Sequence, residues 1–208
     1  MLTHLRRSVA LAAIVLILTF VYALAGTGAS QVLFKHQADG SLTSSGSTLI
    51  GQNWATVSCP GHLTGSCVFH GRPDDTGPYA TNTKQDVAGG DDPLVANGVD
   101  GESGATNLGP RSSVLLQDTK ELVAYWKKLG VDDPTPDLVT TSGSGYDPDI
   151  SAADALVQVP MVSKATGVSQ AALRELISRD TNGAQLGFLG SSYIVVLQLN
   201  EGLAQLRQ

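Results

Sequence analysis

The sequence predicts an α+β protein with one N-terminal transmembrane helix followed by a compact, loop-rich extracytoplasmic α/β-type domain. Three observations predict this class: one long apolar run near the N-terminus, a content of 23 glycines, and a C-terminal part that mixes helical patterns with a β-branched apolar run. A chain of 208 residues accommodates one domain with a hydrophobic core. We expect residues 1–8 as a cytoplasmic N-terminus, 9–29 as the transmembrane helix, 30–47 as a linker and 48–208 as the domain.

The segment Val9–Ala25 contains no charged residue, and Thr19 is its one clearly polar residue. Its length is at the short end of what crosses about 30 Å of hydrocarbon as a helix, and the following GTGAS adds some length. Arg6 and Arg7 precede the segment, and no basic residue follows before Lys35. Because positive flanks stay in the cytoplasm, we expect a single-pass protein of the cell membrane with its domain outside.

A cleavable secretory signal is the alternative interpretation of this N-terminus. Ala23-Leu24-Ala25 fits the small-x-small pattern of a cleavage site after an apolar core. Both interpretations export the domain, and they differ in whether the anchor remains.

The exported part of the chain is acidic. The net charge of the whole chain is −6, and since the first 30 residues contribute +2, residues 31–208 carry −8. Nucleic-acid binding requires clustered Lys and Arg, so this charge argues against a nucleic-acid partner.

Residues 59–110 are rich in Gly, Asp, Asn and Pro, which predicts turns and surface loops, and regular structure is predicted to return after them. A helix is predicted between Ser112 and Gly130, because side chains recur there on one helical face. These side chains are Leu115, Thr119, Leu122, Trp126 and Leu129.

Two further helices are predicted from their N-terminal caps. Ser151 caps a short helix, which Pro160 should terminate or kink because proline lacks the amide donor. Ser169 opens the next helix, which runs to Asp180.

The C-terminal segment is predicted to begin with a strand. Residues 193–199, YIVVLQL, are β-branched and apolar on both faces, which is typical of a buried strand. Asn200 should then cap a last helix.

The segment DLVTTSGSGYDPDIS, residues 137–151, is similar to a phosphate-binding loop but lacks the lysine that would reach the outer phosphates. Asp147 and Asp149 provide fewer oxygens than the 6 to 8 that calcium takes. The sequence contains no G-x-S-x-G, H-E-x-x-H or G-x-x-x-x-G-K-[ST] motif. We therefore expect no catalytic residue, no metal site and a scaffold role for this loop.

The segment CPGHLTGSCVFH contains two cysteines and two histidines, Cys59, His62, Cys67 and His70. This set is chemically complete for tetrahedral zinc. An exported location favours a disulfide between Cys59 and Cys67. Zinc binding and free thiols remain the alternatives.

Six segments in order, after one N-terminal span, resemble the C subunit of the Kdp potassium-transporting ATPase of prokaryotes. They are GSTLIGQ (46–52), FHGRP (69–73), SGATNLGP (103–110), DLVTTSGSGYDPDIS (137–151), QVP (158–160) followed by KATGV, and LGFLGSSYIVVLQLN (186–200). The chain departs from the family where histidine is usual at Asp149, arginine at Met161 and Glu-Pro at Ser191-Ser192. The departures place any role of those individual side chains in doubt.

This resemblance implies an accessory subunit with no cofactor of its own, which does not hydrolyse ATP. Its implied partners are a channel-like potassium-translocating subunit and a P-type ATP-hydrolysing subunit. The family is described as a catalytic chaperone that raises the affinity of the pump subunit for ATP. About eight residues precede the predicted span, too few to enclose a nucleotide, so the topology favours an assembly and stabilising role instead.

The contacts with these partners are expected at three glycine-containing turns, because loops carry exposed backbone groups. The turns are Gly71-Arg72-Pro73, Asn107-Leu108-Gly109 and Gly143-Ser144-Gly145. A membrane-anchored exported enzyme or ligand-binding module is the alternative function, and the lack of any local catalytic motif disfavours it.

Overall fold

The computed structural model describes residues 2–52, 54–55, 57–73 and 107–207. The chain divides into two compact units, residues 1–47 and 48–208. Most of the loop stretch predicted between Cys59 and Pro110 lies outside the described residues.

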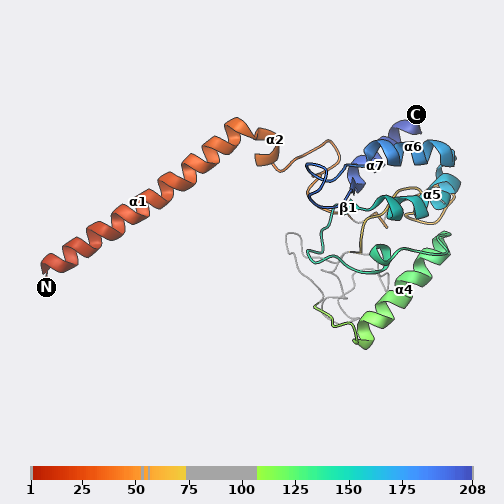
Figure 1. Ribbon diagram of the computed structural model, residues 1–208, viewed down its shortest axis with the longest axis horizontal. Helices are drawn as coiled ribbons and strands as arrows, with labels where there is room; N and C mark the ends of the chain where they lie inside the picture. The colour runs from red at the N-terminus through yellow and green to blue at the C-terminus, as the bar shows by residue number, and fades with distance from the viewer. Residues whose placement is uncertain (1, 53, 56, 74–106, 208) are drawn as a thin grey trace. The chain divides into compact units, whose positions relative to one another are not determined.

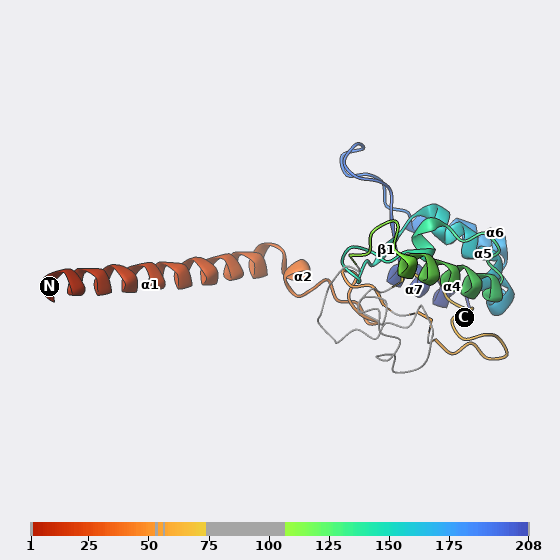
Figure 2. The same ribbon diagram turned by 90° about the horizontal axis from the view of Figure 1, so that it is seen from below.

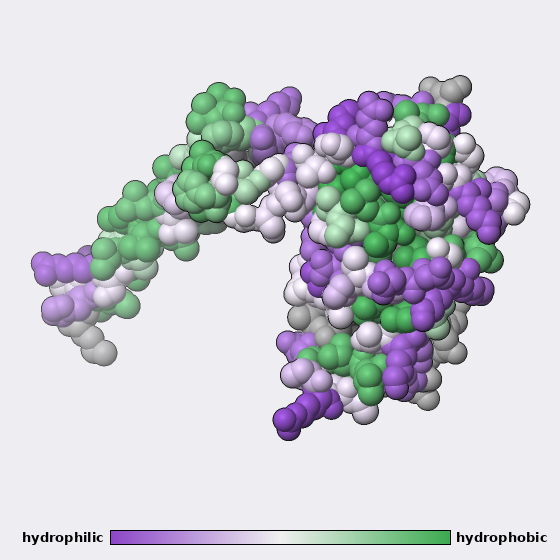
Figure 3. All heavy atoms as spheres, turned by 45° about the vertical axis from the view of Figure 1, so that its right-hand side comes forward, coloured by the Kyte–Doolittle hydropathy of each residue, from purple (hydrophilic) through white to green (hydrophobic). Residues whose placement is uncertain are grey.

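The N-terminal unit consists mainly of helix α1, Leu2–Leu33, whose 32 residues extend beyond the predicted span at both ends. Its most apolar 18-residue window has a mean hydropathy of 2.6, and none of its residues is buried. Figure 3 shows apolar side chains along the helix and hydrophilic ones near its N-terminal end. The hydroxyls of Thr19 and Thr27 donate to carbonyls one turn earlier, which satisfies them within the helix. The helix is therefore long and apolar enough to cross a membrane.

A short helix, α2 (Lys35–Ala38), and an isolated bridge between Leu42 and Ser47 follow α1. The hydroxyl of Ser47 donates to the carbonyl of Gly40 at 2.7 Å. The segment predicted as a linker thus has local structure of its own.

The domain contains a small antiparallel sheet and four α-helices in its described part. Strand β1 (Asp149–Ile150) pairs with β2 (Ile194–Val195), with Asp149 opposite Val195 and Ile150 opposite Ile194. Helix α6 (Gln170–Asp180) packs against both α5 (Ala152–Thr166) and α7 (Val196–Leu206), as Figure 1 shows. The structure confirms the α+β class and the single N-terminal apolar helix.

Helix α4, Ser113–Leu129, forms where the sequence predicts it. The hydroxyl of Ser112 accepts a hydrogen bond from the amide of Leu115, and Gly130 ends the helix in the left-handed conformation. The fully buried Trp126 donates its indole N–H to the carbonyl of Leu138 at 2.8 Å. This bond fixes α4 against the 3₁₀ helix η1, Pro136–Val139.

Helix α5 begins as predicted but ends later. Ser151 and Asp154 form a capping box in which each side chain accepts from the other residue's amide. The helix continues through Pro160 to Thr166 and ends at Gly167, where φ is 76°. Of the two effects predicted for Pro160, termination or a kink, termination is wrong. The apolar residues beyond it, Met161 and Val162, are buried in the core and hold the last turns in place.

The prediction of a strand over residues 193–199 and of a cap at Asn200 is wrong. Only Ile194 and Val195 are strand, and α7 begins at Val196. A short apolar run fits a buried helix as well as a buried strand, and Val196, Leu199 and Leu203 all lie on the buried side of α7. Asn200 consequently lies inside the helix, buried rather than capping it.

The core lies between the sheet and helices α4 to α7. Gly202 allows close packing there, since a Cβ at this position would lie 2.7 Å from Cδ1 of Leu176 on α6. The largest fully buried apolar side chains are Trp126, Phe69, Leu138, Leu173, Ile194, Leu199 and Leu203.

A disulfide joins Cys59 and Cys67 across a separation of eight residues. Both half-cystines are buried and, with Val68, form a small second apolar cluster beside the main core. His62, between them in the sequence, is exposed, whereas His70 is buried. The four side chains therefore do not present a zinc-binding set.

We predict that protein purified under oxidising conditions has no thiol that reacts in denaturant before reduction. Reduction should lower the free energy of unfolding by about 2–3 kcal/mol, because the closed loop restricts the unfolded chain. Denaturant melts with and without reductant measure the difference. The Cys59→Ser/Cys67→Ser variant is the control and should not respond to reductant. Two reactive thiols in the native protein would refute the pairing.

Candidate functional site

The segment Phe69–Pro73 begins with two buried residues, Phe69 and His70. Side chains bind their backbone, and no strand among the described residues pairs with them. The amide of Phe69 donates to Oδ1 of Asn200 at 2.8 Å, and Nδ2 of Asn200 donates to the carbonyl of Phe69 at 2.8 Å. Asn200 lies on α7 and is 8% exposed. One side-chain amide thus satisfies both backbone groups of Phe69.

A second buried amide repeats this arrangement one residue later. Oε1 of Gln158 on α5 accepts from the amide of His70 at 2.8 Å, and its Nε2 donates to the carbonyl of His70 at 3.0 Å. The same Nε2 also donates to the carbonyl of Asp154 at 3.0 Å, and Gln158 is fully buried. We call these two pairings the amide clamp. The clamp fixes residues 69–70 to α5 and α7 together.

The imidazole of His70 connects this segment to the disulfide loop. Its Nε2 lies 2.7 Å from the carbonyl of Gly65, and its ring meets that of Trp126 edge-on at 5.2 Å between centroids. Burial lowers the pKa of His70 to about 4, against the opposing effect of the bond to Gly65. The neutral ring therefore donates its Nε2 proton to that carbonyl. Gly65 adopts a φ of +80°, and a Cβ there would lie 2.9 Å from Cε1 of His70.

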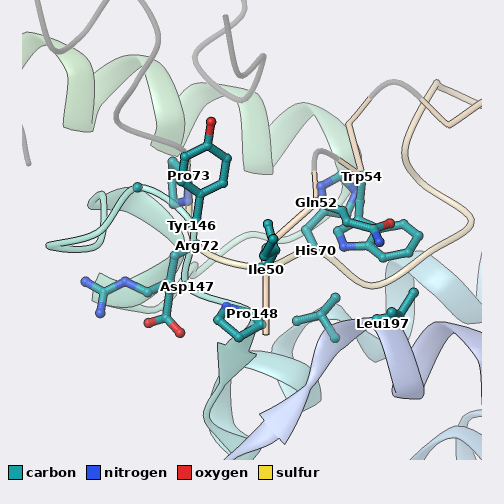
Figure 4. Close-up of a pocket in the computed structure, with 14 residues that line it drawn as sticks. Ile50, Gln52, Trp54, His70, Arg72, Pro73, Tyr146, Asp147, Pro148 and Leu197 are labelled. Atoms are coloured by element: carbon teal, nitrogen blue, oxygen red, sulfur yellow. The ribbon is translucent and has the colours of Figure 1, made fainter. Parts of the chain in front are cut away.

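A cavity of about 30 Å³ lies beside the clamped segment (Figure 4). It is lined by residues 50–52 and 54, by residues 70–73 and by residues 145–148, together with the start of α7. Its volume suffices for one or two water molecules, since one water requires roughly 10–15 Å³. Two of these stretches meet at Gly51, whose amide donates to the carbonyl of Tyr146 at 2.8 Å. A Cβ at Gly51 would lie 2.6 Å from the carbonyl oxygen of Asp147, so only glycine fits.

Arg72 joins the turn 71–73 to the loop that begins at Asp137. Its Nη2 donates to the carbonyl of Thr141 at 3.2 Å and lies 3.7 Å from Oδ1 of Asp137. Its Nε is buried and has no acceptor within the described part of the chain. In Figure 4 the guanidinium group of Arg72 extends away from the side of the cavity that Trp54 and His70 form. The side chain thus binds the domain's own backbone.

The polar side chains of the loop 142–149 also bind the loop itself. The hydroxyl of Ser142 accepts from the amide of Gly145 at 2.9 Å, and that of Ser144 accepts from the amide of Tyr146 at 3.2 Å. Oδ1 of Asp147 accepts from the amide of Asp149 at 3.1 Å. Each of these bonds closes one turn, and Gly145 provides a φ of +72°. The side chains that could have bound a ligand instead hold the path of the backbone.

Asp149 differs from its neighbours because its Oδ1 is buried without a donor among the described residues. Burial, with a further contribution from the charge of Asp147, raises its pKa to about 6. The carboxylate is therefore partly protonated under mildly acidic conditions and destabilises the folded domain when it is charged.

The structure brings two of the three predicted contact turns together. Gly71-Arg72-Pro73 and Gly145 line the same cavity. Asn107-Leu108-Gly109 does not line it; this turn precedes α4, with Asn107 at a φ of 53° and the carbonyl of Gly109 accepting from the amide of Ser112. Among the described residues, no three His, Cys, Asp or Glu side chains converge as a metal site would require.

The sequence interpretation missed Gln158 and Asn200, which form the clamp. The sequence does contain a signal for buried polar side chains, because each of the two is a polar residue at a position that the helical pattern assigns to the buried face. A buried amide side chain needs partners, and an extended segment without a neighbouring strand provides them.

Residues 5–205 match the family described as K+-transporting ATPase, c chain. A protein of Methylobacterium nodulans named Potassium-transporting ATPase KdpC subunit is 39% identical over 214 residues, covering 99% of this chain and 98% of the relative. Proteins with the same name from Rhodopseudomonas palustris strain TIE-1 and Koribacter versatilis are 41% and 37% identical, covering 94% and 88% of this chain and 92% and 84% of the relatives.

We predict that Asn200→Leu lowers the free energy of unfolding by about 2–5 kcal/mol, because it leaves the buried amide and carbonyl of Phe69 without partners. Gln198→Leu is the matched control, since Gln198 is exposed on the same helix and its replacement should change stability by no more than about 0.5 kcal/mol. Urea melts of both variants measure the difference. Equal effects at the two positions would show that the clamp contributes little.

We predict that Asp149→Asn stabilises the domain at pH 7 by up to about 1 kcal/mol, a value reduced because the side chain is only partly buried. The folded pKa is raised from 3.8 to about 6, so the wild type gains stability from protonation below pH 4 and loses it as pH rises through 6. The gain of the variant should therefore disappear near pH 4. The lowered pKa of His70 makes stability change with pH in the opposite direction, but this effect is the same in the wild type and in the variant.

Urea melts of both proteins at pH 4 and pH 7 measure this difference. Asp133→Asn, at an exposed position, measures the general effect of removing one negative charge. A gain from Asp149→Asn that is the same at both pH values would contradict the raised pKa.

Proposed function

Because this chain belongs to the KdpC family of potassium-transporting ATPase subunits, we propose that it is a non-catalytic accessory subunit that assembles and stabilises the pump. The observation that carries this proposal is that polar side chains of the family motifs hold the domain together. Five polar side chains of FHGRP and DLVTTSGSGYDPDIS bind the domain's own backbone, namely those of Arg72, Ser142, Ser144, Asp147 and Ser151. Residues used in this way build a rigid surface rather than a reaction centre.

We place the domain outside the cytoplasm. The single apolar helix α1, in a chain of this family, indicates a single-pass membrane protein. Arg6 and Arg7 lie at the N-terminal end of α1, and basic residues flanking a span favour the cytoplasmic side. The orientation then puts residues 48–208 on the side from which potassium is taken up.

The proposed partners are the channel-like potassium-translocating subunit and the P-type ATP-hydrolysing subunit of the same complex. Helix α1 confines the chain to the plane of the membrane, which raises its local concentration near membrane-embedded partners. The domain provides a second attachment. Two weak attachments on one chain give a stable association without either being strong.

We further propose that the chain has no nucleotide site of its own. The cavity beside the clamp is about 30 Å³, whereas pockets for small ligands occupy roughly 300–1,000 Å³. The proposed orientation also separates the domain from cytoplasmic ATP. Any effect on the ATP affinity of the pump subunit would then act through subunit contacts.

We predict that deleting residues 1–30, while exporting residues 31–208 with an unrelated signal, abolishes co-purification with the pump and growth on limiting potassium. The physical reason is the loss of the in-plane attachment, which no contact of the domain replaces. Replacing α1 with an unrelated transmembrane helix is the control and distinguishes anchoring from specific helix contacts. An intact mass that includes residues 1–30 in the purified complex excludes cleavage of the N-terminus.

Full growth with the anchorless domain would overturn the anchoring part of this proposal. Failure of the complete chain to co-purify with any pump subunit would overturn the accessory-subunit proposal as a whole.

A further inference from the structure

The segment between α6 and β2 projects from the domain as an arm, residues 182–193, visible in Figure 2 as the loop that extends away from the helices. Asn182 and Tyr193 exchange two backbone hydrogen bonds at its base, and Gln185 and Leu189 exchange two near its tip. The three glycines of the arm, at 183, 187 and 190, have no heavy atom within 4 Å of an added Cβ. The described parts of the chain thus leave these positions uncovered.

The tip of the arm exposes three large apolar side chains. Leu186 is 83% exposed, Phe188 is 74% exposed and Leu189 is 49% exposed. No charged residue occurs between Asp180 and Glu201. Single exposed apolar residues are common, but three together on an uncharged projection are typical of an interaction site.

Leu186 is also in an unfavourable backbone conformation. Its φ is 53°, followed by 81° at Gly187, so a leucine occupies a left-handed position where glycine or asparagine costs less. Neither the exposure nor the conformation of Leu186 benefits the isolated domain. Both are explained if the leucine side chain is buried against a partner.

We propose that the tip of the arm, Leu186, Phe188 and Leu189, docks into an apolar depression on another subunit of the same ATPase complex. This inference rests on the proposed function, because it requires that the chain assembles with such subunits. It assigns the second attachment to the arm, in addition to the three turns that the sequence predicts.

The observations favour a protein partner over a lipid surface. Residues 48–208 carry the net charge of −8, which disfavours approach to anionic lipid headgroups. The arm has no Lys or Arg to bind phosphate and no Trp to lie in the membrane interface. An uncharged tip instead fits an apolar depression without leaving a buried charge unpaired.

The tip of the arm can form only a small contact, which is sufficient if the chain is already anchored in the membrane. A stable interface buries about 800 Å² on each partner, more than three side chains at one turn provide. Helix α1 and the segment 34–47 keep the domain within about 50 Å of the end of α1, given roughly 3.5 Å for each extended residue. A small contact is sufficient under this constraint.

The test uses the full chain in its complex, purified in mild detergent. Leu186→Gly/Phe188→Ser removes the apolar tip and relieves the left-handed leucine, so the melting temperature of the domain should stay equal or rise. The chain should nevertheless dissociate from the complex about tenfold faster during gel filtration. Leu116→Ser is the matched control, since Leu116 is 56% exposed on α4, and it should dissociate like the wild type.

A photoreactive maleimide on Phe188→Cys identifies the occupant, because the other two cysteines are joined to each other. A covalent adduct with another subunit of the complex supports the proposal. An adduct only with lipid, only with α1 of the same chain or only with a second copy of the chain overturns it. So does retention of the double variant at the wild-type rate.

The experiment distinguishes a failure of the docking proposal from a failure of the proposed function. If the wild-type chain does not co-purify with the pump, the accessory role fails. If the wild type and the double variant co-purify equally, the accessory role stands and only the arm is excluded.

Discussion

The domain depends on satisfying the backbone of Phe69 and His70 in its interior. Helices α5 and α7 are not adjacent in the chain. Phe69 and His70 pair with no strand in the part of the chain that the structure describes. Asn200 and Gln158 replace such a strand with two side-chain amides. Because buried donors and acceptors without partners cost free energy, the segment can cross the core only where these amides meet it. The clamp thereby sets the positions of the helices, of the His70 ring and of the turn at Arg72.

The same constraint explains the small volume of the cavity. The stretches that line it are held together by backbone bonds and by close contact at Gly51. Polar side chains close turns, cap α5 or bind backbone carbonyls, so few of them are free to meet a ligand. Asp149 is the exception, since burial disfavours its charged form and its Oδ1 has no donor among the described residues. The arm is the opposite case, because it projects from the domain and exposes the large apolar side chains of Leu186, Phe188 and Leu189.

Local patterns predicted much of this fold because local forces determine it. Ser112, Ser151 and Ser169 cap helices as their sequence positions indicate, and α1 follows from hydropathy alone. The errors arose where tertiary packing overrides local preference. Pro160 stays within a helix whose far end is buried, and residues 196–199 are helical although their composition fits a strand. The helical pattern indicates that Asn200 is buried, but its partner could not be predicted, because Asn200 and the backbone of Phe69 are 131 residues apart in the chain.

Amide hydrogen exchange at Phe69 and His70 tests the central role of the clamp most directly. Both amides donate to buried side chains rather than to a strand or helix. If the clamp holds the domain together, these two protons should exchange only through global unfolding, as slowly as the core amides of α5 and α7. Asn200→Leu should increase the rate at Phe69 in proportion to its loss of global stability. Fast exchange at Phe69 and His70 in the wild type, while α5 and α7 remain protected, would contradict this role.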